Sequence, residues 1–122
     1  MIRNQIYKIL EDLLKYDDIH ACMIVEKGMQ GINPPTEKFD KKVLEIWEIF
    51  QKTLDDLFNI IEHYSEYGVG EISLRVMGYE IMVYVIPNSN TALVAVVPSL
   101  ANKGIVEIAL ESTRNKVIDI IK

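Results

Sequence analysis

Several residue types are scarce in this chain, and each scarcity excludes a class of protein. Among 122 residues there is one cysteine, Cys22, so no disulfide can form within one chain. Only 6 Gly and 4 Pro are present, which excludes a collagen-like or low-complexity chain. No apolar run approaches the roughly 20 residues that span a bilayer, and no apolar segment follows a basic N-terminus as in a secretory signal. We therefore expect a soluble protein of a reducing, cytoplasmic compartment, with no membrane partner.

Positive charge is also in deficit. The chain has 13 Lys and Arg against 18 Asp and Glu, a formal net charge of -5. Because phosphate backbones attract basic proteins, nucleic acid is not an expected partner. Apolar residues, in contrast, make up 49% of the chain, which is enough for one domain, residues 1–122, to bury a core.

The hydrophobic pattern predicts an α+β fold. Three segments have apolar residues at helical spacing, and five have the alternating or continuous apolar pattern of strands. The order along the chain is helix-strand-strand-helix-strand-strand-strand-helix. Because the links between successive strands are short, the five-stranded sheet should be antiparallel. The expected helices are residues 2–15, 36–67 and 103–121, and the expected strands are residues 20–26, 29–32, 71–77, 79–86 and 91–97.

Capping and turn residues mark several of these boundaries. Thr36, or Asn33 followed by Pro34, can cap the middle helix, and Gly68 can end it in the left-handed conformation. Asn102 is the expected N-cap of the last helix. A tight turn is expected at Gly28, between the first two strands.

The predicted layers follow from the strands whose apolar faces have to be covered by helices. The last two strands are apolar on both faces, so helices must lie on both sides of the sheet, in a three-layer α/β/α arrangement. The two terminal helices share one face, which leaves the middle helix alone on the other. A helix about 10 Å wide cannot cover a sheet of roughly 24 Å. Its length of about 45 Å also exceeds a strand of about 23 Å, so one end should overhang the sheet unless the helix is kinked or partly unwound.

The middle helix has a second apolar flank beside its main stripe. Together they widen the apolar sector to roughly 220°. The helix is then either deeply buried in its own chain or in contact with a partner. If Ser73 and Arg75 lie on an edge strand, that edge offers unpaired backbone groups, which a symmetric dimer satisfies by continuing the sheet. We therefore predict a homodimer. The flank residues are Ile46, Ile49, Thr53 and Ile60.

With this order established, the sequence resembles the Roadblock/dynein light chain domain family. One matching stretch is Ala21-Cys-Met-Ile-Val-Glu-Lys-Gly-Met-Gln-Gly-Ile32, similar to the family's strand, acidic turn, glycine and second strand. Another is Ala101-Asn-Lys-Gly-Ile-Val-Glu-Ile108, similar to its Asn-x-Gly-apolar start of the last helix. The chain departs from the family at Lys27, where aspartate is usual, and at Pro34 and Pro35, which lengthen the approach to the middle helix.

The resemblance implies a profilin-like architecture and a side-by-side dimer built from the middle helix and the third strand. It also implies a non-enzymatic domain that binds or regulates a Ras-like small GTPase, or scaffolds a complex containing one. The alternative is a small ligand-binding protein or enzyme of longin- or profilin-like fold, whose site between sheet and helices would be lined by Tyr79, Met82, Tyr84 and Cys22. The implied interface residues are Ile46, Trp47, Ile49, Phe50, Thr53 and Ile60 on the helix, with Ser73 and Arg75 on the pairing strand.

Few residues are suited to catalysis. His63 falls on the polar sector of the middle helix and is expected at the surface. His20 and Cys22 alternate on one strand and should share a face, but no third group can be named to orient them. A buried structural cysteine is therefore the favoured interpretation. One Cys and two distant His do not supply the roughly four ligands of a zinc site.

Nucleotide-binding motifs are also missing. Gly68-Val-Gly70 lacks the third glycine of a dinucleotide fingerprint, and no Lys-Ser/Thr pair marks a phosphate loop. We expect no catalytic residue, cofactor or metal. The polar sector of the middle helix is acidic, which fits either a solvated face or a rim that selects a basic patch on a partner. Its acidic residues are Glu45, Glu48, Asp55, Asp56 and Glu62.

Overall fold

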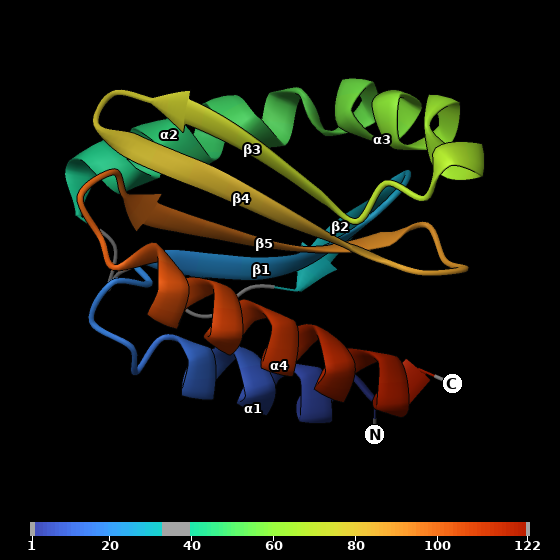
Figure 1. Ribbon diagram of the computed structural model, residues 1–122, viewed down its shortest axis with the longest axis horizontal. Coiled ribbons are helices and arrows are strands. Elements are labelled where there is room, and N and C mark those ends of the chain that lie inside the picture. The colour runs from blue at the N-terminus through green and yellow to red at the C-terminus, as the bar shows by residue number, and fades with distance from the viewer. Residues whose placement is uncertain (1, 33–39, 122) are drawn as a thin grey trace.

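The computed structural model describes residues 2–32 and 40–121 and places the strands in one antiparallel sheet between two layers of helices (Figure 1). The strand order is β2-β1-β5-β4-β3. The α+β class is as predicted. The elements are α1 (Ile2–Leu13), β1 (Ala21–Glu26), β2 (Met29–Ile32), α2 (Lys41–Lys52), α3 (Leu54–His63), the short 3-10 helix η2 (Ser65–Tyr67), β3 (Glu71–Val76), β4 (Tyr79–Ile86), β5 (Thr91–Pro98) and α4 (Lys103–Ile121).

Strand β5 is the middle strand of the sheet and β4 lies beside it, so both are interior strands, in agreement with their two-sided apolar pattern. β5 lies between β1 and β4, with Val83 opposite Val94 and Cys22 opposite Ala95. All but the ends of these two strands are buried. The two faces of the sheet are covered by different helices: α1 and α4 lie side by side on one, and α2 and α3 lie on the other (Figure 1).

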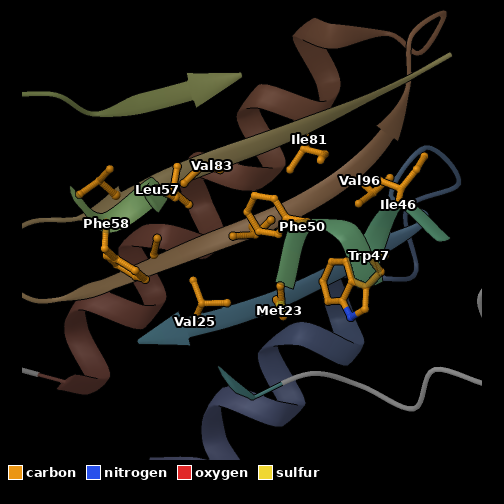
Figure 2. Close-up of a cluster of buried hydrophobic side chains, with 14 of the residues drawn as sticks. Met23, Val25, Ile46, Trp47, Phe50, Leu57, Phe58, Ile81, Val83 and Val96 are labelled. Carbon is orange, nitrogen blue, oxygen red and sulfur yellow. The ribbon is translucent and has the colours of Figure 1, made fainter. Parts of the chain in front are cut away.

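Each face therefore has its own core. On the α1–α4 side, Leu10 and Leu110 pack with Cys22 and Leu93 of the strands. On the other side, Trp47, Phe50 and Phe58 of α2 and α3 lie over alternate strand residues, as Figure 2 shows. The described residues contain no helix that is both long and apolar enough to cross a membrane.

The prediction of a single middle helix over residues 36–67 is wrong. α2 begins at Lys41, because Asp40 is extended and its carboxylate accepts the Val43 amide over 2.8 Å. The helix then stops at Thr53, whose hydroxyl and amide both donate to the Phe50 carbonyl oxygen. The chain thus has four α-helices in its described part, not three, and their order differs accordingly. The predicted caps at Thr36 and Asn33, with Pro34 and Pro35, lie outside the described residues.

Other predicted boundaries agree with the structure. Asn102 caps α4 by accepting the Ile105 amide over 3.3 Å. Gly28 has φ +73° in the β1–β2 turn. Gly68 is left-handed as predicted, with φ +71°, but it follows η2 and does not end the α-helix, because α3 already ends at His63. Residues with a Cβ rarely adopt such conformations, so glycine is favoured in the turns that lead into β2 and β3.

Candidate interaction surface

One flank of the middle helices lies beside the β3 edge of the sheet. On α2, Lys42 Nζ is 5.6 Å from the centroid of the Tyr79 ring, at the β3–β4 turn. Ile49 follows Lys42 about two turns later and therefore lies on the same flank of α2. On α3, Glu62 forms an ion pair with Lys27 in the β1–β2 turn, at the opposite edge of the sheet. Because Ile60 is about 200° around the helix from Glu62, it faces the β3 side.

Apolar side chains on this flank are exposed. Ile49 is 57% exposed, Ile60 48% and Leu74 of β3 43%. Leu74 belongs to the face of β3 that looks toward α2 and α3, because its neighbours across the sheet are Ile81 and then Val96, both in that core. Thr53, Ser73 and Arg75 are exposed as well. We call Ile49, Thr53, Ile60, Ser73, Leu74 and Arg75 the β3-side surface.

The strand at this surface has one unpaired edge. β3 is last in the sheet and pairs with β4 alone among the described strands. The Val85 amide donates to the Gly70 carbonyl over 2.9 Å, so these opposite residues form a hydrogen-bonded pair. Hydrogen-bonded and non-hydrogen-bonded pairs alternate along an antiparallel ladder. The backbone groups of Glu71, Ser73 and Arg75 therefore point away from β4, toward the open edge.

The comparisons with known proteins address the fold. A scan of protein-family models finds no match to this sequence, and a search of curated proteins finds none either. Solved structures do match. MglB of Myxococcus xanthus has a TM-score of 0.73 at 13% identity, over 98% of this chain and 89% of that chain. A Roadblock/LC7 domain from Streptomyces avermitilis has a TM-score of 0.68 at 8% identity, over 93% of this chain and 95% of that chain.

The chain has the Roadblock/LC7 fold. A third match, titled "MglB with tetrameric arrangement", has a TM-score of 0.66 at 12% identity, over 98% of this chain and 89% of that chain. The resemblance stated from the sequence is thus confirmed for the fold. Identities this low show the fold alone.

The structure separates the eight residues named from the sequence into two groups. Ile46, Trp47 and Phe50 are at most 3% exposed and form part of the core under α2. Their side chains therefore have almost no area to offer another chain. The other five are exposed on the β3-side surface of the Roadblock/LC7 fold: Ile49, Thr53, Ile60, Ser73 and Arg75.

Leu74 also belongs to this surface, but it is not among the eight residues predicted from the sequence, although the alternation of β3 contained evidence for it. It alternates with the apolar residues Ile72 and Val76, which are half-buried on the same face of β3. The pattern indicated that Leu74 faces the helices, but not that the helices leave it uncovered.

On the opposite face of β3, charged side chains form a row. Arg114 of α4 donates to the Gly70 carbonyl over 3.2 Å and forms an ion pair with Glu71 at 3.4 Å. Lys103 of α4 lies 2.9 Å from a carboxylate oxygen of Glu80. The hydrogen bond from Lys103 is the main cause that lowers the pKa of Glu80 below its ordinary value. Arg75 is the direct cross-strand neighbour of Glu80.

The residues considered for catalysis are not brought together. The Cys22 thiol is buried, donates to the Leu10 carbonyl over 3.5 Å, and has its pKa raised to about 12 by burial. The His20 ring, in contrast, packs edge-on against Tyr79 at 5.6 Å between centroids. The prediction that His20 and Cys22 share a face is therefore wrong, because His20 precedes β1 and the strand's alternation does not extend to it. Within the described ranges no three metal-ligating side chains gather.

The four residues predicted to line the alternative ligand site also lie on different faces of the sheet. Met82, Tyr84 and Cys22 face α1 and α4, whereas Tyr79 packs on the α2–α3 side. A cavity of about 450 Å³ does open between β3, β4 and α4, with Met82 and Tyr84 in its lining. Its remaining walls are mostly charged, and Glu71 and Glu80 there are already paired with Arg114 and Lys103.

Proposed function

We propose that this chain is a non-enzymatic, homodimeric interaction domain that binds or regulates a Ras-like small GTPase, or scaffolds a complex containing one. The observation that supports it best is the β3-side surface, where exposed apolar side chains stand beside an unpaired strand edge. Exposed apolar patches and open edges of this kind mark protein contacts. We further propose a cytoplasmic location, which suits a single buried thiol.

A second copy of the chain is the partner that matches both halves of this surface. A two-fold axis at the strand edge would continue the sheet from one β3 to the next, and would bring the flanks of the two middle helices together. Ile49, Ile60 and Leu74 would then lose their contact with water. The tetrameric arrangement named for one MglB structure supports self-association as a property of this fold.

The GTPase would bind the outer side of the paired helices. This role is the one that the family resemblance implies. In support, Glu45, Glu48, Asp55 and Asp56 are exposed along α2 and α3 and form an acidic rim. A charged rim mainly sets the choice of partner and the rate of association, so a basic patch on the GTPase is expected.

A binding experiment tests this function. The chain would be immobilised and presented with the small GTPases of the same cell, each loaded with GDP or with a non-hydrolysable GTP analogue. We expect at least one GTPase to be captured preferentially in one nucleotide state. Glu48→Lys with Asp55→Lys should weaken that capture, whereas Glu11→Lys on the exposed side of α1 should not. Absence of nucleotide-dependent capture for every GTPase would contradict the proposal.

A further inference from the structure

We propose that the β3 strands of two copies pair in one register, with Ser73 opposite the partner's Ser73 and Glu71 opposite the partner's Arg75. This inference rests on the self-association proposed above and specifies its geometry. It assigns Glu71 and Arg75 as the residues that select the register.

The free backbone groups limit the possible registers. Only Glu71, Ser73 and Arg75 turn their amide and carbonyl groups to the open edge. In a symmetric antiparallel pair each of them must lie opposite another residue of this set, or opposite a residue just beyond it. The two-fold axis can therefore pass at Glu71, at Ser73, at Arg75 or midway between two of them.

Charge distinguishes these registers. An axis at Glu71 brings two carboxylates together, and an axis at Arg75 brings two guanidinium groups together; like charges directly opposite destabilise a sheet. An axis midway between two of these residues sets one charged residue against Ser73 and leaves it without a cross-strand counter-charge. An axis at Ser73 places a carboxylate opposite a guanidinium twice, once on each side of the axis.

The opposite face of the strand fits the same register. With the axis at Ser73, Leu74 lies opposite the partner's Ile72, and Ile72 opposite the partner's Leu74. Both are apolar and lie on the face toward α2 and α3, where Leu74 is exposed and Ile72 half-buried in the single chain. Directly opposed apolar side chains stabilise an antiparallel pair. The register thus covers Leu74, which is 43% exposed in the single chain.

The paired strands would also join the charged rows of the two subunits. Within one chain Arg114 contacts Glu71 at 3.4 Å, and Lys103 contacts Glu80 at 2.9 Å beside Arg75. In the proposed register the order across the boundary is Arg114, Glu71, the partner's Arg75, the partner's Glu80 and the partner's Lys103. Positive and negative groups alternate throughout this row, so the boundary adds no like-charge neighbour.

Two charge-reversal variants test the register, alone and mixed. Glu71→Arg alone sets Arg against the partner's Arg75, and Arg75→Glu alone sets Glu against the partner's Glu71. Each should weaken its own dimer by about tenfold or more, because two attractive pairs become repulsive. In an equimolar mixture both cross-strand pairs are attractive again, so heterodimers should form with near wild-type affinity, detected by native mass spectrometry of differently tagged chains. Lys8→Glu and Glu11→Arg, on exposed positions of α1, are the control pair and should mix at random.

A cysteine scan gives an independent measurement of the register, which does not depend on reversing the charges of Glu71 and Arg75. In separate variants Glu71, Ser73, Leu74 and Arg75 are each replaced by Cys and treated with a mild oxidant. Ser73→Cys should give the highest yield of cross-linked dimer, because opposite Cα atoms in a sheet lie within disulfide range. The buried Cys22 of the unmodified chain serves as the background.

The results of these experiments distinguish a wrong register from the absence of a dimer. The register would be overturned, while the dimer would stand, if cross-linking were highest for Glu71→Cys, Leu74→Cys or Arg75→Cys. A mixture of the charge-reversal variants that shows no preference for heterodimers would overturn the register in the same way. A wild-type chain that stays monomeric, without cross-linking at any of the four positions, would overturn self-association as well.

Discussion

The Thr53 hydroxyl donates to the Phe50 carbonyl oxygen over 2.9 Å, and the Thr53 amide donates to the same oxygen over 3.0 Å. In an uninterrupted helix this carbonyl would accept the amide of Leu54 instead. Thr53 thus ends α2, and α3 begins directly after it. Ile49 and Ile60, one from each helix, nevertheless remain on the flank that faces β3.

Removing the hydroxyl should lengthen α2. Thr53→Ala takes away one donor to Phe50 and adds a better helix former, so we expect a stronger far-ultraviolet helical signal in circular dichroism. The free energy of unfolding should change by no more than about 1 kcal/mol. Thr53→Ser keeps the hydroxyl and should keep the wild-type signal. Identical spectra for all three proteins would mean that the hydroxyl has no part in the helix break.

Alanine substitutions on the two sides of α2 should differ sharply in their effect on the free energy of unfolding. Phe50 is 3% exposed, so Phe50→Ala should lower the free energy of unfolding by about 3–5 kcal/mol through lost burial and a cavity. The adjacent Ile49→Ala should change it by no more than about 0.5 kcal/mol when measured on the monomer. Urea denaturation at low protein concentration compares them. Losses of equal size would contradict the assignment of Phe50 to the core and Ile49 to the surface.

Stability should fall in alkaline solution because of two buried groups. Burial raises the pKa of Cys22 from 9.0 to about 12, and burial together with the nearby Glu107 raises the pKa of Tyr84 from 10.0 to about 12. Above about pH 9 the unfolded chain loses these protons while the folded chain keeps them. The unfolded state then binds fewer protons, so the free energy of unfolding declines as pH rises.

Urea titrations between pH 7 and about pH 10.5 measure this decline. Cys22→Ala should reduce the part of the decline that starts near pH 9, and Tyr84→Phe the part that starts nearer pH 10. At pH 7, Ellman's reagent should react with Cys22 in urea but not in the folded protein. Rapid reaction in native buffer, or an unchanged alkaline decline in the double variant, would contradict the burial of these groups.

Much of the fold was predictable because local signals and burial agree. β4 has the predicted boundaries because its apolar run ends at turn residues on both sides, and Asn102 caps α4 as its position before the helix indicated. The break at Thr53 was not predictable in the same way. The apolar spacing continues from Phe50 to Leu57 across it, and the length of the predicted helix left an overhanging end and a kink as equal alternatives, with no position for a kink.

The candidate surface was predictable only in part. A helical wheel drawn through a continuous helix merges Ile46 and Ile49 into one wide apolar sector, although the structure buries the first and exposes the second. Tertiary contacts decide this difference. Ile46, Trp47 and Phe50 pack into the core, which leaves the flank with Ile49 at the surface, and no periodicity in the sequence contains that information.

The central claim is that the β3-side surface joins two copies of the chain, and the mass of the protein in solution tests it most directly. Light scattering at micromolar concentration should give twice the chain mass of 14.0 kDa for the wild type. Ile49→Asp, at a 57% exposed position of this surface, should reduce the mass toward that of one chain. Ile105→Asp, at a 53% exposed position on α4, is the matched control and should stay dimeric. A wild-type mass of one chain, or equal disruption by the two substitutions, would contradict the account.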